Sequence, residues 1–415
     1  MTNPIHAVAG AVVLRRLRRW SGSTLRIRLP DGSRRSFGPG SSPRQVRLDV
    51  HHPRFFARAL MGGTTGMGES YMAGEWSSDD LTTLLQEALH NGPRLGLESR
   101  ASLVARLLNA WRHRRRANTR TGSRRNIQAH YDLGNAFYRL FLDETLTYSC
   151  ARWPEGCDDL ATAQRTKMQD ICDKLGLGPE HHVLEIGSGW GGFALHAAQN
   201  TGCRVTGITI SREQLEFSRR RVAEAGLSDQ IDIRFCDYRE IEGQFDRIVS
   251  IEMFEAVGRA YWRRFFEICA RALRPGGRML LQTIAIPDAD VGAPYRGAGW
   301  ISRYIFPGGL LPAMCEIAEA VGTPHRGLDV RQVDEIGPHY VRTLDAWRSR
   351  FWSRIEDVRR LGFDETFVRM WDLYLAVCSA AFATGQIRDV QVLLGHVGET
   401  RAPSSQSVVA AGAAS

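Results

Sequence analysis

From residue 160 onward, short apolar runs alternate with segments long enough to be helices, and this alternation limits the possible folds more than any other feature. Helices are expected in the gaps, for example over Arg212–Ala225 and Tyr261–Leu273. Strands that are joined through helices form largely parallel sheets with helices on both faces. The sequence therefore predicts an α/β fold. Its expected strands are Val183–Ile186, Arg204–Ile210, Ile231–Phe235, Arg247–Ile251 and Met279–Ile284.

The N-terminal part has a different pattern, which predicts a smaller α+β unit over residues 1–110. Apolar residues alternate over 25–29 and 46–50, and Pro30-Asp31-Gly32 supplies a turn after the first run, as expected for short antiparallel strands. A helix is expected to begin near Ser78-Asp79-Asp80, where a serine or aspartate can cap it. An arginine-rich linker over 111–125, a catalytic domain over 126–398 and a disordered tail over 399–415 are expected to follow.

Positive charge is concentrated in the first 125 residues. They hold 22 arginines, no lysine and eight acidic residues, giving +14, whereas the whole chain carries +9. A solvated basic surface is one explanation, and attraction to nucleic acid or to an anionic membrane leaflet is the other. Charge alone does not choose between those partners.

Other bulk features favour a cytoplasmic protein. No run approaches the roughly 18 apolar residues of a membrane span. The eight-residue run Ala7–Leu14 is followed by its arginines, which is the wrong order for a signal peptide. The eight cysteines form no Cys-x-x-Cys pair and no cluster at zinc spacing, so free thiols and no protein-built metal site are expected.

The strongest local motif is Val183–Gly192, an apolar strand that runs into a glycine-rich turn and then a helix. Gly187, Gly189 and Gly191 let the backbone turn sharply and approach a ligand. A dinucleotide site is the obvious competitor. The Gly-x-Gly-x-Gly spacing, with Glu185 two positions earlier, is instead typical of class I methyltransferases, where the acid lies near the methionine ammonium of S-adenosylmethionine.

Further candidate cofactor residues follow the next two strands. Thr209 and Gln214 come after the second strand and are expected to bind the ribose. Asp237 ends the third strand, where it can accept from the adenine amino group while Tyr238 packs on the ring. Taken singly, Asp237 could be a helix cap and Gln214 a surface residue. Their order and spacing together favour S-adenosylmethionine.

Several segments resemble the cyclopropane-fatty-acyl-phospholipid synthases and the related mycolic acid methyltransferases. The likeness is dense over about residues 125–395 and reaches the N-terminal part. It implies a Rossmann-like class I methyltransferase domain preceded by a smaller basic lipid-binding domain. The segments are Gly68–Trp76, His130–Asn135, Leu146–Ala151, Glu185–Gly192, Ile251–Gly258, Tyr304–Gly309, His339-Tyr340 and Thr343–Trp347.

The resemblance implies methyl transfer to the cis double bond of an unsaturated acyl chain in membrane phospholipid, followed by proton loss that closes a cyclopropane ring. The expected base is a bound bicarbonate ion, held by side chains and by the backbone of Ile284. Its other ligands would be Cys150, Glu255, Gln282 and Tyr340. The resemblance also adds Tyr148 and Ser149 to the cofactor site.

One residue departs from the family pattern. The typical cyclopropane synthase has His-Thr-Ile where this chain has Gln282-Thr283-Ile284. Glutamine can donate a hydrogen bond to an anion, but it cannot carry positive charge or shuttle a proton. This leaves a second product close behind the cyclopropane, namely a methylene branch formed after a hydride shift.

Membrane phospholipid and an anionic membrane surface are therefore the expected partners, with the protein peripheral at the inner face of the cell membrane and a homodimer possible. Trp300, Tyr304 and Phe306 are equally well explained as core or as acyl-pocket lining. Three rivals remain: a small-molecule amine N-methyltransferase, an RNA methyltransferase and a non-catalytic lipid-binding protein. The basic N-terminal part argues against an amine N-methyltransferase. The few aromatic residues available for stacking there argue against an RNA methyltransferase, and the intact glycine motif argues against a non-catalytic protein.

Overall fold

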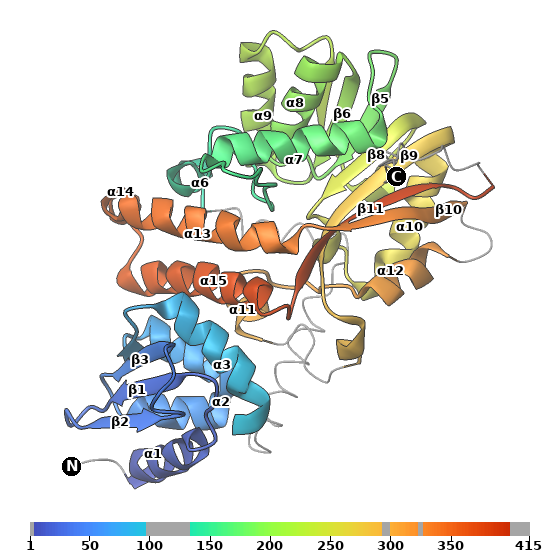
Figure 1. Cartoon of the computed structure of the whole chain (residues 1–415). Coiled ribbons are helices and arrows are strands. Elements are labelled where there is room, and N and C mark those ends of the chain that lie inside the picture. The colour runs from blue at the N-terminus through green and yellow to red at the C-terminus, as the bar shows by residue number, and fades with distance from the viewer. Residues whose placement is uncertain (1–3, 97–132, 293–298, 323–326, 399–415) are drawn as a thin grey trace, which may run out of the picture.

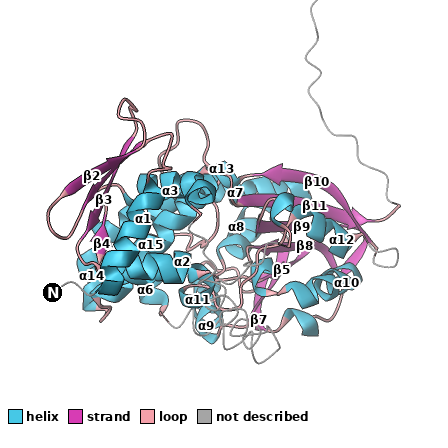
Figure 2. Cartoon of the chain, turned by 90° about the horizontal axis from the view of Figure 1, so that it is seen from below, coloured by secondary structure: helices cyan, strands magenta, loops and turns pink. Residues whose placement is uncertain are grey.

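Two sheets lie at opposite sides of the molecule, with helices between them (Figures 1 and 2). The structure, a computed structural model, describes residues 4–96, 133–292, 299–322 and 327–398. The expected linker over 111–125, the tail over 399–415 and His130 lie outside the described residues. Within the described ranges, no helix is long and apolar enough to cross a membrane.

The larger sheet has seven strands in the order β10-β11-β9-β8-β5-β6-β7. The five strands from β9 to β7 in this order are parallel. This confirms the predicted α/β fold and all five expected strands. Two strands at the other edge run antiparallel and were not predicted. The strands are β5 (His182–Ile186), β6 (Arg204–Thr209), β7 (Ile231–Phe235), β8 (Phe245–Ile251), β9 (Leu273–Ala285), β10 (Leu328–Glu335) and β11 (Arg388–His396).

Helices cover both faces of this sheet, because alternate strand residues face opposite sides. Val183 packs with α7 (Leu160–Leu175), α8 (Gly192–Thr201) and α9 (Arg212–Glu224) in one apolar cluster. Its neighbour Leu184 packs in another cluster. That second cluster includes α10 (Trp262–Ala272) and α12 (Met314–Val321).

The N-terminal unit contains a four-stranded sheet in the order β2-β1-β3-β4. One expectation is wrong here: the two predicted strands, β1 and β3, pair in parallel. The turn at Pro30-Asp31-Gly32 instead leads into β2, which pairs antiparallel with β1. β2 was missed because its sequence, Arg-Arg-Ser-Phe, has no apolar alternation and is largely exposed. The strands are β1 (Thr24–Arg28), β2 (Arg34–Phe37), β3 (Gln45–Val50) and β4 (Trp76–Ser77).

Three helices complete this unit, namely α1 (Pro4–Leu17), α2 (Arg54–Met72) and α3 (Leu81–Leu95). The predicted start of α3 is confirmed, since the Asp80 carboxylate accepts from the Thr83 backbone N–H at 3.0 Å. The unit shares one apolar core with helices from later in the chain, and Figure 1 shows α15 lying against α2 and α3. Those helices are α6 (Asn135–Phe141), α11 (Trp300–Tyr304), α13 (Gly337–Ser353), α14 (Ile355–Arg360) and α15 (Glu365–Ala383).

The aromatic segment after residue 299 packs against α2. Trp300 lies so close to Gly68 that a Cβ at that position would collide with the indole ring. The Tyr304 hydroxyl donates to Glu69 at 2.8 Å, and Arg303 forms an ion pair with the same carboxylate at 2.7 Å. Glycine at residue 68 therefore permits the close contact between α2 and α11.

Candidate active site

The glycine-rich turn lies where the order of the parallel strands reverses. β5 pairs with β6 on one side and with β8, a later strand, on the other. Such a switch point leaves a crevice at the carboxyl ends of the strands, where α/β proteins bind ligands. Gly187 has φ +88°, and a Cβ there would lie 2.8 Å from the side chain of Met253. Only glycine fits this turn, as the motif predicted.

Glu185 offers an unpaired carboxylate oxygen at this crevice. The residue is buried, and its Oε2 has no hydrogen-bond partner in the described part of the chain. Burial raises the pKa of Glu185 to about 8, and the nearby ammonium of Lys167 opposes that rise. A buried acceptor without a donor is costly unless a ligand supplies one. The site thus fits the ammonium group expected of the cofactor.

The residues predicted to bind the nucleoside part of the cofactor already have hydrogen-bond or ion-pair partners within the chain. The Thr209 hydroxyl donates to Gln214 Oε1 at 3.1 Å, so these two side chains do lie together. The Asp237 carboxylate forms an ion pair with Arg239 at 2.8 Å and accepts from the Arg239 backbone N–H at 3.0 Å. Asp237 is therefore also the cap of a short 3-10 helix, Tyr238–Glu240. The Tyr238 ring packs edge-on against Phe265.

The two residues added from the Tyr-Ser-Cys segment have partners within the chain. The hydroxyls of Tyr148 and Tyr374 are 2.8 Å apart. Lys167 donates to the Ser149 hydroxyl at 2.8 Å, and both residues are buried. Burial lowers the pKa of Lys167, while the nearby carboxylates raise it. Ser149 thus holds a buried cation beside the acidic groups of the site.

The predicted base-holding residues converge on Glu252, which sequence reasoning did not single out. The Tyr340 hydroxyl donates to Glu252 Oε2 at 2.6 Å. The backbone N–H of Cys150 donates to Oε1 at 2.7 Å, and Gln282 Nε2 donates to the same oxygen at 3.0 Å. Three groups expected to bind a bicarbonate are therefore bonded to this one side chain.

Glu255 accepts a hydrogen bond from the Ile284 backbone, the last of the donors predicted to hold the bicarbonate ion. The Ile284 backbone N–H donates to its Oε1 at 2.6 Å, and the Thr283 hydroxyl donates to the same oxygen at 2.9 Å. Its Oε2 is buried and has no hydrogen-bond partner among the described residues. Burial, with a smaller contribution from the Glu252 charge, raises the pKa of Glu255 to about 7.

Cys150 is fully buried, and its thiol donates to backbone carbonyl oxygens. The Sγ lies 3.3 Å from the oxygen of Ala151 and 3.6 Å from that of Ile336. Burial and the charges of Asp389 and Glu252 raise the pKa of this thiol well above its ordinary value. Cys150 is therefore a neutral thiol in this structure, and its backbone N–H makes the contact with Glu252.

Three site residues were missed by the sequence reasoning, and each left a weak signal. Glu252 stands in the same motif as Glu255, three positions earlier. Lys167 is one of only two lysines in the chain and falls on the apolar face of α7. Asp389 is a fully buried acid at the start of the apolar strand β11. Gln282 Nε2 donates to its Oδ2 at 3.0 Å.

Comparison with known proteins identifies the family of this chain. The family model described as mycolic acid cyclopropane synthetase matches residues 118–392. The chain belongs to this family. The mycolic acid cyclopropane synthetase family consists of S-adenosylmethionine-dependent methyltransferases, so this member is an enzyme of that type. The predicted family and fold class are confirmed.

Individual members of the mycolic acid cyclopropane synthetase family resemble most of the chain. It is 40% identical over 392 residues to the tuberculostearic acid methyltransferase UfaA1 of Mycobacterium tuberculosis, covering 92% of this chain and 90% of that protein. It is 38% identical over 358 residues to the cyclopropane-fatty-acyl-phospholipid synthase of Escherichia coli, covering 85% and 87%. The solved structure of mycolic acid cyclopropane synthase CmaA1 with SAH and CTAB aligns with a TM-score of 0.61 and 32% identity, covering 66% of this chain and 98% of that one.

Proposed function

We propose that this enzyme transfers the methyl group of S-adenosylmethionine to the cis double bond of an unsaturated acyl chain in membrane phospholipid. The observation that carries the proposal is the position of Glu252, which follows β8 beside the glycine turn and Glu185. An alkene is a weak, neutral nucleophile, and its methylation creates a carbocation. Carboxylates next to the methyl donor suit a reaction that builds positive charge and then loses a proton.

Two products are compatible with such a cation. Direct loss of a proton from the new methyl group closes a cyclopropane ring, which is the product the family resemblance implied first. A hydride shift before proton loss gives a methylene branch instead. Gln282 in place of histidine favours the branch, and so does the name of the relative covering 92% of this chain, a methyltransferase rather than a cyclopropane synthase. The bicarbonate ion stays a prediction, and the hydrogen bonds of Glu252 argue against it.

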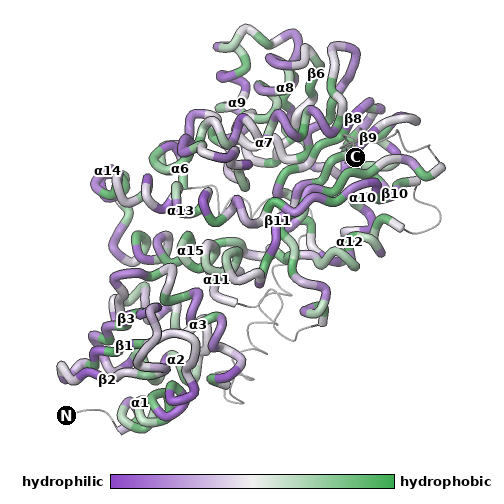
Figure 3. The backbone as a smooth tube through the Cα atoms, in the orientation of Figure 1, coloured by the Kyte–Doolittle hydropathy of each residue, from purple (hydrophilic) through white to green (hydrophobic). Residues whose placement is uncertain are grey.

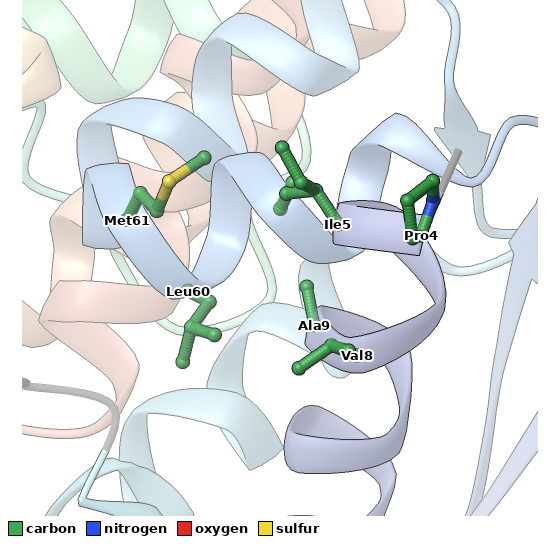
Figure 4. Close-up of a pocket in the computed structure, with 7 residues that line it drawn as sticks. Pro4, Ile5, Val8, Ala9, Leu60 and Met61 are labelled. Carbon is green, nitrogen blue, oxygen red and sulfur yellow. The ribbon is translucent and has the colours of Figure 1, made fainter.

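The proposed membrane-docking surface is the exposed face of α1 with the adjoining part of α2. Ile5, Val8 and Met61 are 60%, 64% and 51% exposed. They line a shallow apolar pocket together with Leu60 and Pro4 (Figure 4). A monomeric soluble surface seldom groups large apolar side chains in this way without a partner.

Charge complementarity supports an anionic lipid surface as the partner. Figure 3 shows α1 changing from hydrophobic to hydrophilic along its length. Val8 and Arg15 lie seven residues apart on one face of α1, Arg18 follows directly after the helix, and all three are exposed. An apolar patch can enter the acyl boundary while each arginine near the headgroups contributes about 1 kcal/mol. Attachment at the inner face of the cell membrane and homodimer formation remain proposals.

The decisive experiment incubates the protein with isotope-labelled S-adenosylmethionine and oleoyl phospholipid vesicles, followed by mass spectrometry of the released fatty acids. The proposal requires a gain of one CH2 unit. A product that resists hydrogenation is the cyclopropane, whereas uptake of two hydrogens identifies the methylene branch. No labelled lipid from a protein that binds the cofactor would contradict the proposal and favour an amine or RNA acceptor.

A further inference from the structure

The donors expected to hold a bicarbonate ion are already bonded to carboxylates of the chain. Tyr340, Gln282 and the Cys150 backbone donate to Glu252, and the Ile284 backbone donates to Glu255. An added bicarbonate would have to displace these bonds and would meet carboxylates instead of donors. These residues therefore do not fit a second anion.

The backbone at Glu252 is held in an unfavourable conformation. Glu252 has φ +48°, and among the described residues the only other non-glycine with a positive φ is Leu146. A left-handed backbone is unfavourable for a residue with a Cβ, because the Cβ comes too close to the following carbonyl oxygen. The Glu252 backbone N–H donates to the Gln282 carbonyl oxygen at 2.8 Å, which fixes this geometry. Strain of this kind concentrates at functional sites, where the surrounding structure maintains it.

Glu252 and Asp389 are two acids that share one donor. Gln282 Nε2 lies 3.0 Å from an oxygen of each carboxylate, so the two acids lie close together. Burial and the adjacent charges of Glu252 and Glu255 raise the pKa of Asp389 well above its ordinary value. Desolvation raises the pKa of Glu252 as well, whereas the hydrogen bonds from Tyr340 and the Cys150 backbone lower it, so a proton held by the two acids is favoured on Asp389. The Lys167 ammonium lies near enough to offset the remaining charge.

We infer that the Glu252 carboxylate is itself the base of the reaction, in the place where a bicarbonate ion would otherwise be bound. This inference rests on the proposed function and names the group that completes it. Glu252 is intermediate in exposure, whereas Cys150, Gln282 and Asp389 are fully buried, and Glu252 directly follows β8 beside the glycine turn.

The proposed step balances without any further reagent. The π electrons of the alkene form a bond to the methyl carbon as its bond to sulfur breaks, and S-adenosylhomocysteine leaves with that electron pair. The other alkene carbon becomes cationic. Glu252 takes a proton from the new methyl group, and the C–H electron pair closes the ring, or forms the methylene double bond if a hydride has first moved to the cation. The Glu252–Asp389 pair then holds two protons and is neutral.

The test compares the full-length enzyme with Glu252→Gln, Glu252→Gly and the exposed control Glu242→Gln, in carbon-dioxide-free buffer with and without bicarbonate. Glycine adopts the backbone at residue 252 readily, so Glu252→Gly is expected to fold. Wild type and Glu242→Gln are expected to turn over oleoyl phospholipid equally with or without bicarbonate. Glu252→Gln is expected to lose about 100-fold or more in kcat, the range for a general base, with S-adenosylmethionine binding retained. Bicarbonate is expected to restore activity to Glu252→Gly only.

A calorimetric titration with bicarbonate separates this inference from the proposed function. Glu252→Gly is expected to bind the ion and the wild type is not, even if no variant methylates lipid. A wild type that binds bicarbonate and needs it for turnover would overturn the inference. So would a Glu252→Gln enzyme with near-normal kcat, or a Glu252→Gly enzyme that neither binds nor responds to the ion.

Discussion

The hydroxyl of Tyr71 in α2 donates a 2.6 Å hydrogen bond to Asp372 Oδ2 in α15, across 301 positions of sequence. The other oxygen of Asp372 accepts from Arg348 and Trp352, both at 2.7 Å. Asp372 is almost fully buried, so this one carboxylate joins the basic N-terminal unit to two helices of the catalytic part. The proposed lipid-docking surface and the proposed methyl-transfer site are therefore parts of one packed structure.

We expect Tyr71→Phe to lower the free energy of unfolding by about 1.5–3 kcal/mol, because a buried hydrogen bond to a charged group is lost. Asp372→Ala is expected to cost about 3–5 kcal/mol, since it leaves the partly buried Arg348 without its carboxylate. Urea denaturation measures both. The control is Glu365→Gln in the exposed pair with Arg359, for which less than about 1 kcal/mol is expected. Equal losses of unfolding free energy for all three variants would contradict the conclusion that Asp372 holds the N-terminal unit against α13 and α15.

We expect Glu185→Gln to weaken S-adenosylmethionine binding roughly 10- to 150-fold, corresponding to the loss of about 1.5–3 kcal/mol from a charge-assisted bond. Because burial places the pKa of Glu185 near 8, the free enzyme holds a proton there at pH 7. Binding a cation ionises the carboxylate and releases that proton, so affinity should rise as the pH approaches 8. Calorimetry in buffers of different ionisation enthalpy detects the release, which Glu185→Gln should abolish and Glu180→Gln at the surface should not.

The Glu255 carboxyl is expected to lower stability as the pH rises. Its pKa is raised from about 4.5 in the unfolded chain to about 7 in the folded one. A raised pKa means that the stabilisation is complete below pH 4.5 and is lost as the pH increases to 7, to a total of about 3 kcal/mol. Urea midpoints measured from pH 4.5 to 7.5 should show a smaller decline for Glu255→Gln than for the wild type. Parallel curves would show that Glu255 is ionised throughout.

Replacement of Val8 by aspartate is expected to weaken binding to anionic vesicles at least about tenfold, since it removes an apolar contact and adds a repelled charge. Arg15→Glu with Arg18→Glu should reduce binding further and flatten its dependence on salt. Leu361→Asp serves as the matched control, because Leu361 is a 45% exposed apolar residue outside the N-terminal unit. Vesicle sedimentation measures all of these. Undiminished binding of the Val8 and arginine variants would place the docking surface elsewhere.

Sequence patterns predicted the parallel strands well, because most of the apolar runs are buried on both sides of the sheet, and β7 alternates between buried and exposed residues as an edge strand does. The antiparallel pair β10 and β11 escaped prediction, since three helices separate these strands and β10 is largely polar and exposed. Local motifs also predicted the glycine turn. They could not give the role of Glu252, because its partners Cys150, Gln282 and Tyr340 come from three distant segments. Asp237 is the opposite case. Its carboxylate, which was expected to bind the adenine amino group, forms an ion pair with Arg239, two positions along the chain.

The left-handed backbone at Glu252 also bears on how such enzymes diverge. Glycine suits φ +48° better than any other residue, and a change of one nucleotide converts a glutamate codon into a glycine codon. On the role proposed for Glu252, that mutation would relax the chain while making catalysis depend on dissolved carbon dioxide. On the same role, retention of glutamate would make the proposed methylation of lipids independent of dissolved carbon dioxide. On this proposal, an unfavourable backbone conformation at one residue removes the dependence of the enzyme on dissolved carbon dioxide.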